Sequence, residues 1–223
     1  MEYPRARILV FAKAPVAGYA KTRLVPFLGG APAAGLQQEL ITRTLDIATG
    51  DDLCPVELWC APDCEHTFFD RCRTSYDITL HRQLGQDLGQ RMAQALASTL
   101  RNNRPVLLIG TDNADLSDEY LRGAIELLAT ESDVVIGPAM DGGYVLIGLN
   151  RFIPELFDSI PWSSDQVLAV TRRRLERLAV DWRELKACHD IDRPEDLEYL
   201  PEPLNAIFSQ AELVQRKNRN NAV

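Results

Sequence analysis

The sequence has no long hydrophobic run. No apolar stretch approaches the roughly 20 residues that a membrane-spanning helix needs. The first apolar stretch ends at Lys13, which is too early for a signal peptide. Low-complexity segments and internal repeats are also missing. These absences predict a cytoplasmic protein without a membrane partner, with one domain over residues 1–214 and a polar, disordered tail over residues 215–223.

Positively charged residues are fewer than negatively charged ones, with 24 Lys and Arg against 32 Asp and Glu and a formal net charge of −8. A general nucleic-acid binder would usually carry a basic face, so we expect no nucleic-acid partner. The deficit does not exclude a phosphate ligand, because a few placed cations or a metal ion can hold phosphate within an acidic protein.

Tightly spaced cysteine pairs and a nucleophile triad are absent as well. The five cysteines lack the C-x2-C spacing of common zinc sites, so we expect free thiols rather than zinc ligands. The three histidines form no triad pattern with a serine or cysteine, which argues against a hydrolase of that kind. The residues concerned are Cys54, Cys60, Cys64, Cys72, Cys188, His66, His81 and His189.

Strand-like and helix-like segments alternate along the chain. The expected strands are 7–12, 56–61, 77–81, 105–110, 133–136, 144–149 and 181–186. The expected helices are 33–49, a short helix after 61, 87–101, 117–130, 164–178 and a short helix from 194. This order predicts a three-layer α/β/α domain with a mostly parallel sheet, in which ligands bind beyond the carboxyl ends of the strands.

A cationic loop follows the first strand and contains Lys13, Gly18, Lys21, Thr22 and Arg23. A glycine lets backbone N–H groups approach a phosphate, and the cations neutralise it. The loop lacks the spacing of a P-loop and of a dinucleotide-binding fingerprint. It therefore indicates a nucleotide-phosphate site of another kind, with a solvated basic loop as the alternative.

Carboxylates follow two other strands. Asp112 comes directly after the clearest strand, and Asp190 and Asp192 lie near the C-terminus. Mg²⁺ prefers one or two carboxylates plus substrate phosphates, so these three residues are candidate ligands for Mg²⁺ or Mn²⁺. The alternatives are a turn for Asp112 and helix capping for Asp192. Asp115 could be a second ligand, but it is expected rather to help start the helix that follows.

Three further segments carry candidate ligand contacts. Asp141, Gly142, Gly143 and Tyr144 form either an acceptor site or a plain hairpin turn. Trp162 and Ser163 lie on a possible substrate loop, although a serine there could cap the next helix. A base or ribose could lie near Gly85, with Asp87 either in the nucleotide site or capping the following helix.

These motifs occur together in one order that resembles a known family. The matching segments are 13–24, 85–92, 110–112, 137–144, 161–165 and 190–197. The chain resembles a small bacterial glycosyltransferase-A-like family often labelled selenodomain-associated transferase 1. More distantly, it is similar to guanylyltransferases acting on 2-phospho-L-lactate and on the molybdenum cofactor. The resemblance covers about residues 7–200.

The resemblance implies a nucleotide-diphospho-sugar transferase fold and a divalent metal near Asp112 and the late aspartates. It implies phosphate contacts for the cationic loop and acceptor contacts for residues 141–144. Asn113-Ala114 departs from the family pattern, in which Cys or Ser is followed by Pro.

Three functions follow as hypotheses. The first is Mg²⁺-dependent transfer of a nucleoside monophosphate from a triphosphate to a small phosphorylated or hydroxyl acceptor. Lys21, Arg23, Asp112 and Asp141 are its candidate catalytic residues. The second is glycosyl transfer from a nucleotide-diphosphate sugar. The third is nucleotide binding without catalysis.

Overall fold

The computed structural model describes residues 1–208, and the expected tail over residues 215–223 lies outside them. A seven-stranded sheet runs through the molecule in the order β3-β2-β1-β4-β6-β5-β7. Its strands are β1 (Arg7–Lys13), β2 (Val56–Ala61), β3 (Thr79–Arg82), β4 (Val106–Gly110), β5 (Val134–Pro138), β6 (Tyr144–Leu149) and β7 (Trp182–Glu184). Only β6 runs antiparallel to its neighbours β4 and β5, so the prediction of a mostly parallel α/β sheet is confirmed.

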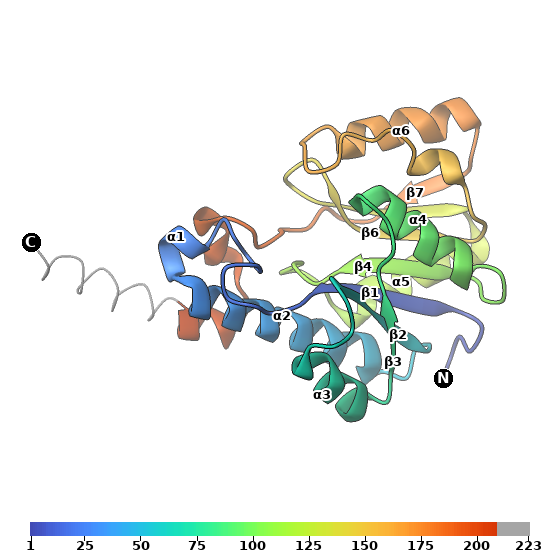
Figure 1. Cartoon of the computed structure of the whole chain (residues 1–223). Helices are drawn as coiled ribbons and strands as arrows, with labels where there is room; N and C mark the ends of the chain where they lie inside the picture. Colours follow the sequence, from blue (N-terminus) through green and yellow to red (C-terminus); the bar gives the residue numbers. More distant parts are fainter. Residues whose placement is uncertain (209–223) are drawn as a thin grey trace, which may run out of the picture.

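Helices cover both faces of the sheet (Figure 1). They are α1 (Val25–Leu28), α2 (Gly30–Gly50), α3 (Thr67–Tyr76), α4 (Leu88–Thr99), α5 (Asp118–Thr130) and α6 (Val167–Leu178), with 3-10 helices η1 (Pro154–Leu156) and η2 (Pro194–Tyr199). Among the described residues, no helix combines the length and the hydrophobicity of a membrane span.

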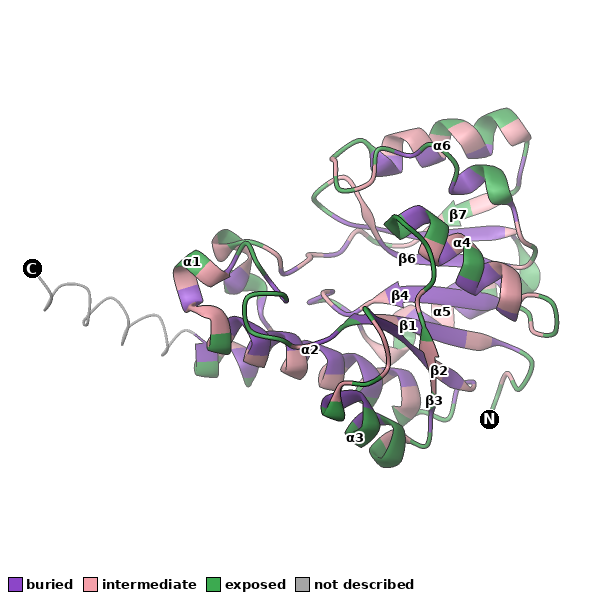
Figure 2. Cartoon of the chain, viewed as in Figure 1, coloured by how far each residue is buried: buried purple, intermediate pink, exposed green. Residues whose placement is uncertain are grey.

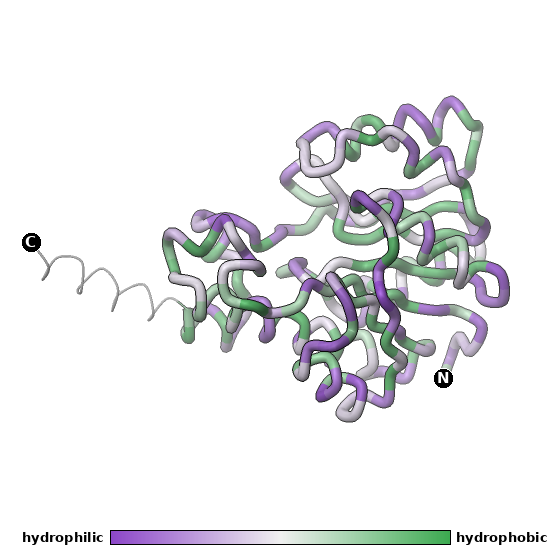
Figure 3. The backbone as a smooth tube through the Cα atoms, viewed as in Figure 1, coloured by the Kyte–Doolittle hydropathy of each residue, from purple (hydrophilic) through white to green (hydrophobic). Residues whose placement is uncertain are grey.

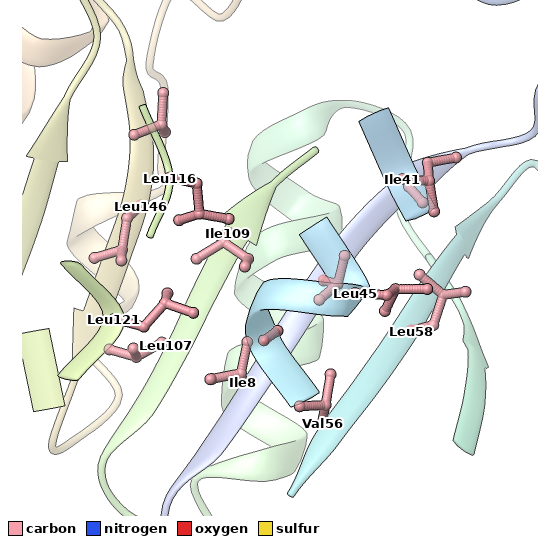
Figure 4. Packing of buried hydrophobic residues seen from close by; sticks show 14 of the residues in the cluster. Ile8, Ile41, Leu45, Val56, Leu58, Leu107, Ile109, Leu116, Leu121 and Leu146 are labelled. Atoms are coloured by element: carbon pink, nitrogen blue, oxygen red, sulfur yellow. The ribbon is translucent and has the colours of Figure 1, made fainter. Parts of the chain in front are cut away.

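Two apolar clusters fill the space between the sheet and its helices. On one face, Ile41 and Leu45 of α2 belong to a cluster with side chains of α3, α5 and the strands. Figure 4 shows these two residues with labelled side chains of α5 and the strands. On the other face, Met92 of α4 and Leu175 of α6 pack on a second set of strand side chains. The central strands are buried and apolar along most of their length (Figures 2 and 3), which is why they read as continuous hydrophobic runs.

A third apolar cluster lies beyond the ends of the strands. Leu24 and Leu28 at α1 and Leu36 of α2 pack in one cluster with Ile191 and Leu197 from the C-terminal segment. Figure 1 shows these two parts of the chain side by side at the left of the view. This small lobe brings the loop after β1 next to the segment after β7, and both carry candidate site residues.

The start of one expected helix needs correction. The helix expected from residue 164 begins at Val167, and Gln166 occupies its N-cap position without a side-chain hydrogen bond to the helix. Ser163 and Ser164 therefore do not cap α6. The short helix from Pro194 is a 3-10 helix. The predicted cap of α5 is confirmed, because the Ser117 hydroxyl accepts a hydrogen bond from Tyr120 N.

Candidate functional site

The segment after β4 and the segment after β7 run alongside each other at the carboxyl edge of the sheet. Ile191 N donates to Asp112 O at 2.9 Å, and Ala114 N donates to His189 O at 2.9 Å. Asn113 and Asp190 form an antiparallel bridge between the same two segments. Backbone hydrogen bonds thus bring the early and the late carboxylates to one place.

Lys21 reaches this place from the loop after β1. Its side chain is only 2% exposed, and its Nζ lies 2.8 Å from Oδ1 of Asp112. Nζ also donates to the backbone oxygen of Ile191. The backbone of Lys21 has φ of +48°, which is uncommon for a residue other than glycine. The loop therefore holds this residue in an unusual conformation while its amine sits between both acidic segments.

Arg23 forms an ion pair with Asp192 across the same junction. The predicted capping role of Asp192 is wrong, because the carboxylate that caps η2 belongs to Asp196, which accepts from the backbone N of Asp192 and of Arg193. The Asp192 side chain is thus left to hold the Arg23 guanidinium, which is 52% exposed.

Two residues of α2 support the Asp112 segment, and the sequence patterns did not single them out. Gln37 is buried and donates to Thr111 Oγ1 at 3.2 Å, and Thr111 Oγ1 donates to Asp112 Oδ1 at 3.3 Å. The Arg43 guanidinium donates to the backbone oxygens of three residues in the loop at 2.9–3.2 Å. These residues are Asn113, Ala114 and Leu116. Arg43 therefore fixes a loop that lacks the proline of the resembled family.

The carboxylates outnumber the cations at this junction. Burial and the nearby charge of Asp112 raise the pKa of Asp190 to about 7, and Asp141 and Asp192 act in the same direction. Lys21 opposes this shift but does not cancel it. Without a further cation, Asp190 therefore binds a proton far more readily than an ordinary aspartate.

The donor set fits a magnesium ion that shares its coordination with a ligand. Within residues 1–208, no three His, Cys, Asp or Glu side chains are grouped so that they alone could hold a metal. Mg²⁺ does not need such a cage, since it is commonly held by one or two carboxylates together with substrate phosphates and water. Asp112 and Asp190 could supply that pair, because the charge of Asp112 lies near enough to raise the pKa of Asp190. Asp112 is also paired with Lys21, and Asp192 with Arg23.

The segment 141–143 forms the turn of the β5–β6 hairpin. Gly143 N donates to Asp141 Oδ1 at 2.9 Å, and Gly142 has φ of +90°. A methyl group on Gly142 would collide with the backbone of Asp165, and Leu168 N donates to Gly142 O at 2.9 Å. The segment therefore forms the hairpin turn that was the alternative to an acceptor site. The turn is also anchored to the start of α6, and the charge of Asp141 is near enough to help raise the pKa of Asp190.

Tyr144 and Trp162 lie together beside α4. Their rings meet edge to face with centroids 6.4 Å apart, and the indole covers Gly89, where a methyl group would overlap the ring. The Tyr144 hydroxyl is buried without a hydrogen-bond partner, and burial raises the pKa of Tyr144. The neighbouring Ser163 is exposed.

The remaining nucleotide-site candidates differ in their surroundings. Lys13 lies over the Tyr19 ring at 4.0 Å, and Thr22 is exposed. Gly18 has φ of +79° with open space around it. Asp87 caps α4 by accepting from Gln90 N at 2.8 Å, which confirms the capping alternative.

Gly85 also has a structural reason for its identity. A methyl group there would lie 2.7 Å from Arg91 N. The conformation of the loop before α4 therefore requires glycine at this position.

Asp115 has a different partner from the one expected. Its Oδ2 accepts from His189 N at 2.7 Å and lies 2.9 Å from His189 Nδ1, so it joins the two acidic segments rather than starting α5. The cysteines are free thiols, as expected.

The comparisons with other proteins agree with this architecture. A family model described as "Uncharacterized protein conserved in bacteria (DUF2064)" matches residues 44–164, more than half of the chain. The chain belongs to this family. No curated protein matches the sequence significantly.

Solved structures extend the DUF2064 match to the whole fold. A candidate nucleotide-diphospho-sugar transferase from Desulfovibrio desulfuricans G20 is 27% identical, with TM-score 0.85 over 96% of this chain and 98% of that one. The inositol-1-phosphate CTP transferase from T. maritima is 12% identical, with TM-score 0.59 over 94% and 97%. CMP:2-keto-3-deoxy-manno-octonic acid synthetase, solved with CTP, is 10% identical, with TM-score 0.57 over 92% and 99%.

These similarities confirm the nucleotide-diphospho-sugar transferase fold that the resemblance implied. The narrower label of selenodomain-associated transferase 1 stays a prediction.

Proposed function

We propose that this protein is a Mg²⁺-dependent nucleotidyltransferase. It would move a nucleoside monophosphate from a triphosphate to a small phosphorylated or hydroxyl acceptor. The observation that carries the proposal is the buried Lys21 amine placed between Asp112 and the segment of Asp190, with Arg23 held beside it by Asp192. The structural neighbours that use CTP support the choice of a nucleotide.

The carboxylates of Asp112 and Asp190 would hold the metal. A bound Mg²⁺ supplies positive charge that neutralises phosphate oxygens and orients them for displacement. Its charge also offsets the surplus of carboxylates at the junction, which Lys21 alone does not balance.

The chain's own residues would act by position and charge. An acceptor oxygen forms a bond to the α-phosphorus while the bond to the bridging oxygen breaks and pyrophosphate leaves. Lys21 and Arg23 stabilise negative charge on the leaving group, and Asp141 at the hairpin turn accepts the proton of a hydroxyl acceptor. The positive φ of Gly18 gives the loop a tight turn, from which backbone N–H groups can face the phosphates.

A second candidate is glycosyl transfer, which the 27% identity to the candidate nucleotide-diphospho-sugar transferase favours. The same cations would then stabilise a departing nucleoside diphosphate.

One thermal-shift experiment separates the two functions. We expect at least one nucleoside triphosphate with Mg²⁺ to raise the melting temperature of the wild type. Lys21→Met should abolish this shift, and Arg101→Met, which changes an exposed arginine just after α4, should keep it. Strong protection by sugar nucleotides together with none by triphosphates would refute nucleotidyl transfer and support glycosyl transfer.

A further inference from the structure

Gln83 lies directly after β3, at the edge of the sheet that carries the cationic loop. Its backbone N donates to Cys60 O at 3.0 Å, so the ladder between β2 and β3 continues to this residue. Its side chain reaches across β2 to β1. The side-chain Nε2 donates to Trp59 O at 2.8 Å and to Ala12 O at 3.3 Å. Ala12 immediately precedes Lys13, where the cationic loop begins.

These two hydrogen bonds fix the orientation of the side-chain amide. Both partners are carbonyl oxygens, which only accept, so the NH₂ group must face them and the oxygen must face the other way. Gln83 Oε1 accepts no hydrogen bond from residues 1–208, and it is not among the enclosed polar atoms that lack a partner. The sheet therefore holds a solvent-accessible acceptor in a single orientation.

The surroundings of this acceptor suit the flat faces of a nucleobase. Leu84 and Leu88 follow it in sequence and are 50% and 45% exposed, so they offer apolar surface near this acceptor. Two residues back along β3, the rings of Trp59 and His81 stack with centroids 4.9 Å apart. Gly85 keeps the chain before α4 free of a side chain.

We propose that Gln83 Oε1 accepts a hydrogen bond from the exocyclic amino group of the bound base. The ligand would then be a cytosine, adenine or guanine nucleotide rather than a uracil nucleotide. This inference rests on the proposed function, because it assumes that the phosphates lie on the loop of Lys21 and Arg23. A base with a carbonyl oxygen in place of the amino group would set two acceptors against each other.

The test compares pairs of nucleotides that differ at the amino group. CTP and UTP form one pair and ATP and ITP a second, in which a carbonyl oxygen replaces the amino group. GTP and ITP form a third pair, in which hydrogen replaces the amino group. Each nucleotide is also tested as the diphosphate, and dissociation constants with Mg²⁺ are measured by calorimetry. The wild type should bind at least one amino-bearing nucleotide about tenfold or more tightly than its counterpart without the amino group.

Two variants isolate the acceptor. Gln83→Met removes both the acceptor and the donors, whereas Gln83→Lys retains donors for Trp59 O and Ala12 O but supplies no acceptor. Both variants should reduce the preference for the amino-bearing nucleotide to within about threefold, because the hydrogen bond that discriminates between the two bases is lost. Gln94→Met, an exposed position on α4 away from the edge, should keep the full preference.

The outcomes are distinguishable from failure of the proposed function. Nucleotide binding by the wild type without an amino preference, or a preference that survives both Gln83 variants, would overturn the inference and leave the nucleotide site intact. Absence of binding to every nucleotide in the panel would overturn the proposed function and this inference with it.

Discussion

Lys21 Nζ lies 2.8 Å from Asp112 Oδ1, although the two residues come from different loops at the edge of the sheet. The lysine is almost completely buried, and its amine also binds the backbone beside Asp192. A buried ammonium group needs negative partners, and here they come from the two segments that would hold a metal. This contact joins the cationic loop, the strand-end aspartate and the late aspartates into one site.

Lys21→Met should destabilise the protein. It would leave Asp112 and Asp190 without their shared cation, and because Asp112 is 33% exposed we expect a loss of about 1–3 kcal/mol in the free energy of unfolding at pH 7. Urea denaturation measures this loss. Arg101→Met, at an exposed arginine just after α4, is the control and should change stability by less than about 0.5 kcal/mol. Equal stability of Lys21→Met and the control would show that the pair is not important for folding.

Asp190→Asn should stabilise the metal-free protein in a pH-dependent way. The folded-state pKa of Asp190 is raised to about 7, so the native state keeps a proton that the unfolded state has lost above its ordinary pKa. Stability therefore falls as pH rises from about 4 to 7, and the asparagine variant escapes this loss. The gain should be small at pH 4 and reach the order of a few kcal/mol at pH 8.

Thermal melts between pH 4 and 8 in a metal chelator measure this difference. Asp181→Asn, at an exposed carboxylate with no side-chain partner among residues 1–208, is the control and should show no such trend. A gain that is the same at pH 4 and pH 8 would rule out the raised pKa as its cause.

Arg43→Met should loosen the loop after Asp112. Three backbone oxygens would lose a charged donor, which we expect to cost about 2–3 kcal/mol and to weaken Mg²⁺-dependent nucleotide binding severalfold. Arg43→Lys should restore part of the stability but not the three-point contact. Arg101→Met, at an exposed arginine, serves as the control. Unchanged nucleotide affinity in Arg43→Met would show that the loop holds its shape without the guanidinium.

Gly142→Ala should destabilise the β5–β6 turn. Its φ of +90° disfavours a side chain, and the added methyl group would collide with the backbone of Asp165. We expect a loss of about 2–4 kcal/mol. Gly123→Ala in α5 has open space around the added atom and should stabilise the helix by about 0.5–1 kcal/mol. Thermal denaturation should show a lower melting temperature for Gly142→Ala and a higher one for Gly123→Ala. A melting temperature of Gly142→Ala equal to that of the wild type would contradict this account of the turn.

Periodicity and strand-end motifs were enough to predict much of the fold. The continuous apolar run of β4 indicated a strand buried on both faces, and the position of Asp112 directly after it indicated the correct edge of the sheet. These are local signals, because a strand and the residue after it lie on neighbouring positions of the chain.

Contacts between distant segments could not be predicted in this way. Asp115 was assigned to the nearest helix, yet its partner is His189, and only the folded chain brings them together. Helix capping was the alternative for Asp192, yet Asp196 caps η2 and Asp192 pairs with Arg23, which is remote in sequence. Local patterns cannot rank such alternatives.

Arg43 and Gln37 carried a signal that motif reading did not use. Arg43 lies seven residues after Leu36 and three after Leu40, on the stripe of α2 that is otherwise apolar. Polar side chains on a buried stripe need hydrogen-bond partners. Arg43 and Gln37 find theirs in the segment around Asp112. Polar interruptions of an apolar stripe are thus a practical indicator of residues that support a site.

The most direct measurement is calorimetric titration of the best-bound nucleoside triphosphate into the wild type and Asp112→Asn, each with and without Mg²⁺. The account predicts that Mg²⁺ tightens binding to the wild type about tenfold or more, and that Asp112→Asn keeps the weak metal-free binding but loses this gain. An equal gain from Mg²⁺ in both proteins, or no gain in the wild type, would contradict a metal-bound phosphate at the junction of Lys21, Asp112 and Asp190.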